Sequence, residues 1–337
     1  MSWGYVKFAD LYEAPSKNGL TKPSKIRGNG FKMINMGELF ANDRIYDIPM
    51  ELVPLTDSEK EKNKIEVGDL LFARQSLVLE GAGKCSIVLE VLPLTVFESH
   101  LIRVRLKKEK ASPLFYYYYF RSQYSPIKTI VSQCAQAGIR GSDLSELMVL
   151  CPPLEKQQYI AGILSTYDDL IENNQKQIKL LEEAAQRLYK EWFVNLHFPG
   201  FENTSAMDGV PEGWKKDTLG DIAILKAGGD RPTVFSKEKH DKYLVPVYSN
   251  ETDNEGLYGY TDTPIIEDEC VTISARGSVG YSCLRRMPFV PIVRLISVIP
   301  KEIDVIYLYL YLKNFKFDSN GAAQQQITVP MIKDETA

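Results

Sequence analysis

Cysteine, histidine and long apolar runs are scarce in this sequence. The 337 residues include five cysteines, no two of them closer than 13 residues, and three histidines that lie far apart. This spacing fits reduced thiols better than a disulfide framework or a zinc site. No stretch approaches the roughly 18 consecutive apolar residues of a membrane span, and the N-terminus has no basic segment followed by an apolar one. We therefore expect a cytoplasmic protein without contact to a membrane.

Recognisable catalytic motifs are lacking as well. The segment 80–85 is similar to a phosphate-binding loop, but Val78 stands where the first glycine is required and Cys85 replaces the Ser or Thr. We interpret this segment as a turn beside a strand. The Asn/Asp-Pro-Pro-Tyr signature of adenine methyltransferases is absent, and the acidic run 267–269 has no following lysine of a nuclease site. We expect that the chain is not an enzyme.

The charge is distributed unevenly along the chain. Against 40 Lys and Arg stand 44 Asp and Glu, which gives a net charge of −4. Residues 1–150 carry 20 basic and 17 acidic side chains (+3), residues 151–198 carry 5 and 7 (−2), and residues 199–337 carry 15 and 20 (−5). The acidic total argues against a generic polyanion binder. The hydrophobic fraction of 44% and the length are typical of a folded chain of about two domains.

Residues 154–194 differ in kind from their neighbours. They contain no proline and a single glycine, Gly162, and apolar residues recur at helical spacing. Pro152 and Pro153 suit the position just before a first helical turn, and Pro199-Gly200 is a stop signal. The sequence therefore predicts one helix, about 60 Å long at 1.5 Å per residue.

One face of this helix is apolar. The spacing of its residues alternates between three and four, with one extra four-residue step near Asn174, which is a heptad pattern with a stutter. The stripe consists of Ile160, Ile163, Tyr167, Leu170, Ile178, Leu181, Ala185, Leu188 and Trp192. We expect this stripe to pack against another helix.

The segments before and after the helix resemble each other, in the same order. Residues 6–11 resemble 217–222 at an offset of 211, and 101–104 resemble 295–298 at an offset of 194. Between these pairs, the dipeptide Ala-Arg at 73–74 recurs at 275–276, an offset of 202. The aromatic run 115–120 likewise has a counterpart at 307–312. Four matches in order indicate two copies of one domain.

Each copy combines short apolar strands, for example 270–274 and 292–299, with one aromatic helix. The predicted class is therefore α+β. We expect two repeated domains, 1–150 and 199–337, joined by a central helical region, 151–198.

A further pattern lies in the helix and in the second copy. The helix begins with the sequence Pro-Pro-Leu-Glu-Lys-Gln at 152–157 and continues with Asp-Asp at 168–169 and Asn-Asn at 173–174. The second copy contains Ile-Ser-Ala-Arg-Gly-Ser-Val-Gly at 273–280. Together with the order domain, helix, domain, these residues resemble the specificity subunit of type I restriction-modification systems, over nearly the whole chain.

The resemblance implies two target recognition domains, each of which reads one half of a split sequence in double-stranded DNA. Two antiparallel helices separate these domains in the family. Modification (methyltransferase) subunits carrying S-adenosylmethionine dock on the helices, and restriction subunits join outside. The resemblance implies no cofactor on this chain itself. Because partner subunits add phosphate contacts, we expect the isolated chain to bind DNA weakly.

The second helix of the family pattern is not found in this sequence. If Ile139 corresponds to Ile327, Ala337 falls opposite Val149, just before a second helix would begin. We expect self-pairing through residues 154–194, a helix supplied by another polypeptide, or a truncated chain. Two other interpretations are a recognition arm of a fused methyltransferase or nuclease, and an inactive or phase-variable truncated allele.

DNA reading requires side chains such as Arg, Gln and Asn on loops that reach base edges, with further cations on phosphates. The candidates lie in polar, glycine-containing loops beside the predicted strands. They are Arg74, Gln75, Lys84, Gln136 and Arg140 in the first copy, and Arg231, Asn250, Arg276, Ser278, Gln324 and Gln325 in the second. The recurrence of Ala-Arg places Arg74 and Arg276 above the others.

Overall fold

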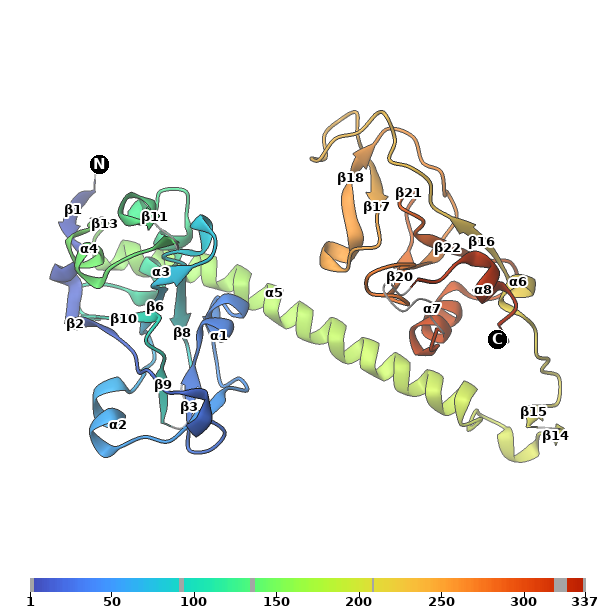
Figure 1. The fold of residues 1–337 in the computed structure, drawn as a ribbon, viewed down its shortest axis with the longest axis horizontal. Coiled ribbons are helices and arrows are strands. Elements are labelled where there is room, and N and C mark those ends of the chain that lie inside the picture. Colours follow the sequence, from blue (N-terminus) through green and yellow to red (C-terminus); the bar gives the residue numbers. More distant parts are fainter. Residues whose placement is uncertain (1–2, 91–93, 134–136, 208, 318–325, 336–337) are drawn as a thin grey trace. The chain divides into compact units, whose positions relative to one another are not determined.

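The computed structural model describes residues 3–90, 94–133, 137–207, 209–317 and 326–335. The chain divides into two compact units, Met1–Lys176 and Gln177–Ala337. The division falls within the 36-residue helix α5 (Leu154–Tyr189), so each half of this helix is described with its own unit. Figure 1 labels the elements of both units. The predicted α+β class and the long helix between two domains are confirmed, whereas the boundaries at 150 and 198 stay a prediction.

The first unit combines short strands with short helices. Its strands are β1 (Gly4–Lys7), β2 (Tyr12–Asn18), β3 (Phe31–Ile34), β4 (Arg44–Ile45), β5 (Glu51–Val53), β6 (Leu70–Ala73), β7 (Gln75–Ser76), β8 (Cys85–Val88), β9 (Thr95–Phe97), β10 (Leu101–Leu106), β11 (Ser132–Gln133), β12 (Ala137–Gly138) and β13 (Met148–Cys151). Its helices besides α5 are α1 (Met36–Ala41), α2 (Asp57–Asn63), α3 (Pro113–Arg121) and α4 (Gly141–Glu146), with a 3-10 turn η1 (Phe8–Leu11).

A five-stranded sheet in the order β2-β10-β6-β8-β4 forms the centre of this unit. The aromatic run predicted as a helix is α3, which lies against β8 and buries Phe115, Tyr116 and Phe120. Phe8 contacts the rings of Tyr116 and Phe120, with centroids 5.6 and 4.9 Å apart. A smaller sheet, β5-β3-β9, and a 3-stranded one, β11-β12-β7, complete the unit together with the pair β1-β13. The aromatic residues are therefore core residues.

The second unit contains β14 (Ala206–Met207), β15 (Val210–Pro211), β16 (Ala223–Ala227), β17 (Val245–Tyr248), β18 (Leu257–Thr261), β19 (Cys270–Ile273), β20 (Ser282–Arg285), β21 (Val290–Pro291) and β22 (Ile296–Pro300). Its helices are α6 (Leu219–Ile222), α7 (Val305–Asn314) and α8 (Val329–Lys333). The central sheet has the order β16-β22-β19-β20, and a smaller one the order β18-β17-β21. The predicted strand 292–299 is shorter than expected. Val293 and Arg294 have φ values of 54° and 62°, which interrupt the extended chain before β22.

The two units repeat one topology. Strands β2, β10, β6 and β8 correspond in order and direction to β16, β22, β19 and β20, and both smaller sheets hold one parallel pair, β3-β9 and β17-β21. The backbone N–H of Phe8 donates to Leu147 O (2.9 Å), as that of Leu219 does to Glu335 O (2.8 Å). These pairs reproduce the predicted offsets of 211 and 188. The internal repeat is therefore confirmed as a structural one.

A glycine marks the same close approach in each unit. A Cβ on Gly19 would lie 2.1 Å from the carbonyl oxygen of Phe97, and one on Gly228 would lie 2.7 Å from that of Pro291. Real Cβ atoms do not approach backbone oxygens so closely. Glycine is therefore required where the strand β2 or β16 ends and the chain crosses to the smaller sheet.

The start of α5 is attached to the first unit by a buried amide. Gln157 is fully buried; its Nε2 donates to Pro152 O (2.7 Å), and its Oε1 accepts from the N–H of Ser112 (2.9 Å). Farther along the helix, Arg44 forms ion pairs with Asp169 (2.5 Å) and Glu172 (3.1 Å), and the Tyr118 hydroxyl donates to Asp168 (2.8 Å). The polar residues of the Pro-Pro-Leu-Glu-Lys-Gln and Asp-Asp motifs thus hold the helix on its domain.

The end of α5 is attached to the second unit by aromatic rings. Tyr189 is buried, and its ring lies 5.8 Å from that of Tyr307 on α7. A π-helical turn, η5 (Lys190–Val194), continues the helix and brings Phe193 to 4.8 Å from the Tyr307 ring. Burial raises the pKa of Tyr189 above the usual value of a tyrosine, so its hydroxyl is even harder to ionise.

Much of the predicted apolar stripe of α5 is exposed within each unit. Ile163, Tyr167 and Leu170 are 45%, 64% and 52% exposed in the first unit. In the second, Ile178 and Leu181 are 58% and 70% exposed. An apolar face of this extent on a helix is typical of a surface that another helix covers.

Candidate nucleic-acid interface

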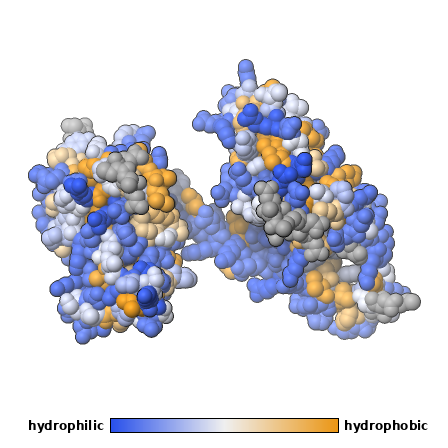
Figure 2. Space-filling view, viewed as in Figure 1, coloured by the Kyte–Doolittle hydropathy of each residue, from blue (hydrophilic) through white to orange (hydrophobic). Residues whose placement is uncertain are grey.

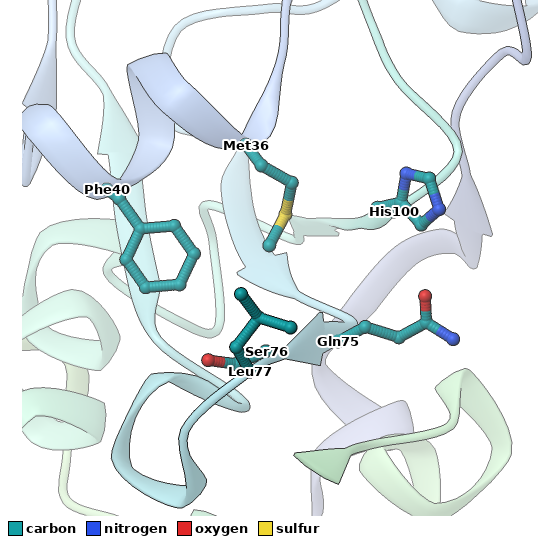
Figure 3. A pocket seen from close by; sticks show the side chains of 6 residues that line it. All are labelled: Met36, Phe40, Gln75, Ser76, Leu77 and His100. Atoms are coloured by element: carbon teal, nitrogen blue, oxygen red, sulfur yellow. The ribbon is translucent and has the colours of Figure 1, made fainter. Parts of the chain in front are cut away.

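Three segments of the first unit meet at the carboxyl end of strand β6. They are strand β7 with the residue after it, helix α1 and the turn between β9 and β10. Together they form a pocket of about 360 Å³ lined by Met36, Phe40, Gln75, Ser76, Leu77 and His100. Figure 3 shows the apolar side chains of Met36, Phe40 and Leu77 on one side, and the polar ends of Gln75 and His100 on the other. The pocket thus presents an apolar and a hydrogen-bonding wall.

Backbone hydrogen bonds fix the frame of this pocket. The N–H of Arg74 donates to His100 O (2.8 Å), and the N–H of Ile139 donates to Arg74 O (2.9 Å). Gln75 is paired with Gly138 in the β7-β12 ladder. The frame therefore holds the backbone on both sides of the Gln75 side chain.

An asparagine side chain holds the corresponding site of the second unit together. Asn250 Oδ1 accepts from the N–H of Ala275 (2.7 Å), and its Nδ2 donates to Val293 O (2.6 Å). The amide thereby ties the segment of Arg276 to the turn that carries Arg294. The outward part of this site consists of the exposed residues Arg276, Ser278 and Arg294.

The ladders decide which residues of the two sites correspond. Phe72 pairs with Ile102 in β10, and Ile273 pairs with Ile296 in β22. Since β10 and β22 correspond at an offset of 194, Phe72 corresponds to Ile273. The offset of this segment is therefore 201 rather than the 202 predicted from the Ala-Arg recurrence.

The Ala-Arg correspondence is thus wrong by one residue. Arg74 corresponds to Ala275, and Gln75 corresponds to Arg276. The hydrogen bonds agree, because Arg74 O accepts from Ile139 N (2.9 Å) as Ala275 O accepts from Ile327 N (3.0 Å). Likewise Gln75 pairs with Gly138, and Arg276 forms a bridge with Gln326, two residues again 188 apart. A sequence comparison missed this because two dipeptides agreed by chance.

An insertion in the first unit explains why the sequence was hard to align there. Gly83 N–H donates to Ala73 O (2.8 Å), as Gly280 N–H does to Ser274 O (3.0 Å), so these glycines correspond. Eight positions separate Gln75 from Gly83 (83 − 75), but four separate Arg276 from Gly280 (280 − 276). The four additional residues include Leu77, Val78 and Leu79, which are 88%, 59% and 46% exposed. Figure 2 shows orange, hydrophobic areas among blue, hydrophilic ones on the surface of the first unit, whose elements are labelled in Figure 1.

Two of the predicted DNA-reading residues are engaged within the protein. Lys84 donates to Phe40 O (2.7 Å) and forms an ion pair with Asp43 (3.0 Å). Both polar ends of the Asn250 amide are bonded to backbone groups. Lys84 and Asn250 therefore shape their loops, and reading a base would require them to give up these bonds.

The other predicted residues with described side chains are available. The guanidinium of Arg231 lies over the ring of Phe235 at 4.9 Å. For the side chains of Arg74, Gln75, Arg140, Arg276 and Ser278, the described part of the chain supplies no hydrogen bond or ion pair. Gln75 and Arg276 lie at the two site centres, while Arg140 precedes α4. Gln136, Gln324 and Gln325 lie outside the described residues.

Two site residues were missed from the sequence, His100 and Arg294. They correspond to each other at the offset of 194 and lie in the turn before β10 or β22. Val293 and Arg294 both have positive φ, which for a β-branched residue such as valine is strained. The sequence lacks the Asn-Gly signature of such a turn, so the turn could not be predicted.

Charged groups beside the first site form a compact network. Burial alone would raise the pKa of Asp43, but hydrogen bonds from Arg121 (2.6 Å) and Lys84 outweigh it and hold that pKa below its usual value. In the second unit, the buried Arg285 donates to Thr272 Oγ1 (3.0 Å) and Glu255 O (2.6 Å) and lies over the Tyr248 ring. These cations stabilise the loops rather than face outward.

The described histidine, cysteine and carboxylate side chains do not form a recognisable catalytic site. Among the described residues, no group of His, Cys, Asp and Glu could hold a metal ion. The described cysteines, Cys85, Cys151, Cys270 and Cys283, are free thiols, and burial raises the pKa of Cys85 and Cys270. Within the same ranges no helix is long and apolar enough to cross a membrane.

Comparison with known proteins shows one family. The model of the family described as type I restriction modification DNA specificity domain matches residues 2–183 and 211–336. A type I specificity subunit of Mycoplasma pneumoniae is 29% identical over 213 residues, which cover 58% of this chain and 59% of the relative. A second one from the same organism is 32% identical over 195 residues, 57% of this chain and 50% of the relative. The chain thus spans 50–59% of the length of these two relatives.

Two further comparisons extend over more of the chain. The specificity subunit of a type I restriction enzyme from Methanocaldococcus jannaschii is 29% identical over 293 residues, 82% of this chain and 67% of the relative. The crystal structure of a type I restriction-modification system S subunit from M. genitalium superimposes with a TM-score of 0.56. It is 18% identical and covers 93% of this chain and 77% of that one, which shows a shared fold.

Proposed function

This chain belongs to the type I restriction modification DNA specificity family, and on that premise we propose that it recognises a two-part DNA sequence for a type I restriction-modification complex. Each unit reads one half of the target. The observation that supports the proposal is the structural repeat. The central sheets of the two units have the same strand pairing, so each unit presents corresponding loops at the corresponding end of its own sheet. Two such surfaces suit a target with two separate parts.

We infer that the chain supplies recognition and assembly, and that the catalytic groups belong to its partner subunits. Methylation of adenine or cytosine requires S-adenosylmethionine, which we assign to the modification subunit and not to this chain. The described residues fit this division, since their exposed candidate groups are Gln and Arg, which suit base edges and phosphates rather than methyl transfer.

Helix α5 is the proposed docking surface for the partner subunits. Its apolar stripe is exposed on both units at residues such as Tyr167 and Leu181. A modification subunit or the α5 helix of a second copy would bury it, with restriction subunits joining the complex outside. The polar groups of the Asp-Asp motif are already used to hold the helix, so the stripe is the part left for partners.

The experiment is co-expression of the full chain with its cognate modification subunit, in a host without its own DNA methylation. Sequencing of the modified bases should reveal one motif with two defined parts and a fixed spacer. The modification subunit expressed alone is the control and should leave the DNA unmodified at that motif. Modification without this chain, or no complex between the two proteins by size-exclusion chromatography, would contradict the proposal.

A further inference from the structure

The corrected alignment places one pair of residues at the centre of both recognition sites. Gln75 and Arg276 each follow the end of a central strand, β6 or β19, by two or three residues. The backbone of each is held by pairing with the segment before α4 or α8, through Gly138 or Gln326. Neither side chain has a partner within the described residues. A fixed backbone with a free polar side chain is what base reading requires.

We propose that this aligned pair determines one base pair in each half of the target: an A·T pair for Gln75 and a G·C pair for Arg276. The inference rests on the proposed function and specifies the ligand of its two sites. It assigns different base preferences to two residues that occupy equivalent positions in the fold.

The first site suits an adenine and the methyl group of a thymine. A glutamine amide offers one donor and one acceptor, which match N7 and N6 of adenine in the major groove. The opposite wall of the pocket, with Met36, Phe40 and Leu77, is apolar and suits the C5 methyl group that only thymine carries there. A guanine would place its O6 acceptor where the amide expects a donor.

The second site suits guanine for equally simple reasons. The guanidinium of Arg276 presents two parallel donors, which match O6 and N7 of guanine. The position of the apolar Met36 is taken here by Asn250. This follows from the register, because Met33 and Val247 correspond in the parallel pairs β3-β9 and β17-β21. The apolar wall is therefore absent at the one position that the alignment defines.

Asn250 also explains why Arg276 keeps its place without a side-chain partner. Its amide bonds the N–H of Ala275, the residue next to Arg276, and the carbonyl of Val293, the residue next to Arg294. Two exposed arginines thus lie on segments joined by one side chain. Arg294 corresponds to His100 and adds a cation at the edge of the second site only.

The test exchanges the two residues in the full chain, co-expressed with its modification subunit. Arg276→Gln should replace a single G·C by A·T in one half of the methylated motif, or remove the preference there, and leave the other half unchanged. Gln75→Arg should change one A·T position in the other half. For the purified complex, discrimination at the affected base pair should fall about 5- to 150-fold, as expected for loss of a bidentate contact.

Matched controls carry the same changes elsewhere in each unit. Arg286→Gln alters an exposed arginine that follows β20, at the opposite end of that strand from the Arg276 loop. Gln123→Arg alters an exposed glutamine beyond the end of α3. Complexes that contain either control variant should methylate the unchanged motif.

The outcomes separate this inference from the proposed function. A wild-type complex with a two-part motif, combined with an unchanged motif for Arg276→Gln and Gln75→Arg, would overturn the assignment and leave the function standing. No motif for the wild type would overturn both. Where an exchange abolishes methylation, duplexes carrying each of the four base pairs at the assigned position decide: a retained preference for the original pair counts against the inference, and its loss supports it.

Discussion

The first and the second unit share a topology but hold helix α5 by different chemistry. In the first, a buried glutamine amide and carboxylates on the helix make directional bonds, with Gln157, Asp168 and Asp169 as the main groups. In the second, the rings of Tyr189, Phe193 and Tyr307 pack together, and one partly exposed ion pair joins Glu182 of the helix to Lys313 of α7 (3.7 Å). Directional bonds fix the rotation of a helix on its domain, whereas ring packing tolerates small shifts. The two units therefore share their sheet topology, although the contacts that attach α5 to each unit differ.

Removing the aromatic attachment should have the largest effect. Tyr189→Ala deletes a buried ring and is expected to lower the free energy of local unfolding of the second unit's helix end by about 3–5 kcal/mol. Hydrogen exchange of the amides around Tyr189 and α7 measures it. Tyr167→Ala, at an exposed position of the same helix, is the control and should change stability by no more than about 0.5 kcal/mol. Equal exchange in both variants would refute the role of the ring.

Removing the polar attachment should cost somewhat less. Gln157→Ala leaves the N–H of Ser112 without its acceptor, and we expect a loss of about 1–3 kcal/mol at the start of α5. The neighbouring exposed residue supplies the control, Gln158→Ala. Hydrogen exchange of residues 154–162 in the two variants gives the comparison. Protection that is no lower in Gln157→Ala than in Gln158→Ala would show that the amide is dispensable.

The two recognition sites should contribute to binding independently. Arg276→Ala is expected to weaken specific binding of the complex by about 1–3 kcal/mol, and Gln75→Ala by a similar or smaller amount. Because the two residues lie in different units without shared partners, the double variant should show the sum to within about 0.5 kcal/mol. Titration of the cognate duplex with the purified complexes measures all three values. Unchanged affinity for Arg276→Ala would rule out its assignment, and a strong deviation from the sum would show that the sites are coupled.

The smallest expected effect concerns pH and the first unit alone. The pKa of Asp43 is lower in the folded protein than its usual value of 3.8, so the ion pairs with Lys84 and Arg121 contribute stability above that value. This contribution is lost as the pH falls through the lower pKa of the folded state. Since Asp43 is 42% exposed, solvent screens the pairs and the effect is modest. Thermal unfolding of the wild type and Asp43→Asn should converge below about pH 3.8; a constant difference down to pH 2 would contradict this.

The sequence was sufficient for the architecture because architecture depends on periodic signals. The proline pair at 152–153, the apolar heptads and the repeated order of strands predicted the long helix and the α+β class correctly. The assignment of the sites depends on the register between the two units, and an error of one residue in that register assigns the wrong residue. A chance Ala-Arg match lay one residue away from the true correspondence, which became visible only in the hydrogen-bond ladders.

Side-chain bonding was the other quantity beyond the reach of the sequence. Asn250 and Lys84 have the residue types of DNA-reading groups and lie in suitable loops, yet their bonds are made inside the protein. Conversely, Arg294 lies in a turn with a left-handed backbone, and the local sequence has no motif that predicts such a turn. Such assignments depend on which atoms lie within about 3 Å, and the chain order does not contain that information.

Gln75 pairs through its backbone with Gly138, and Arg276 pairs with Gln326. This main-chain pairing has a consequence for inheritance. The ladder that holds these residues uses only main-chain groups, so it accepts almost any side chain at either position. On the proposed function, one codon change there rewrites which genomic sites carry a methyl mark and keeps this main-chain pairing. A lineage that acquires it then differs from its siblings in the epigenetic signature of its DNA.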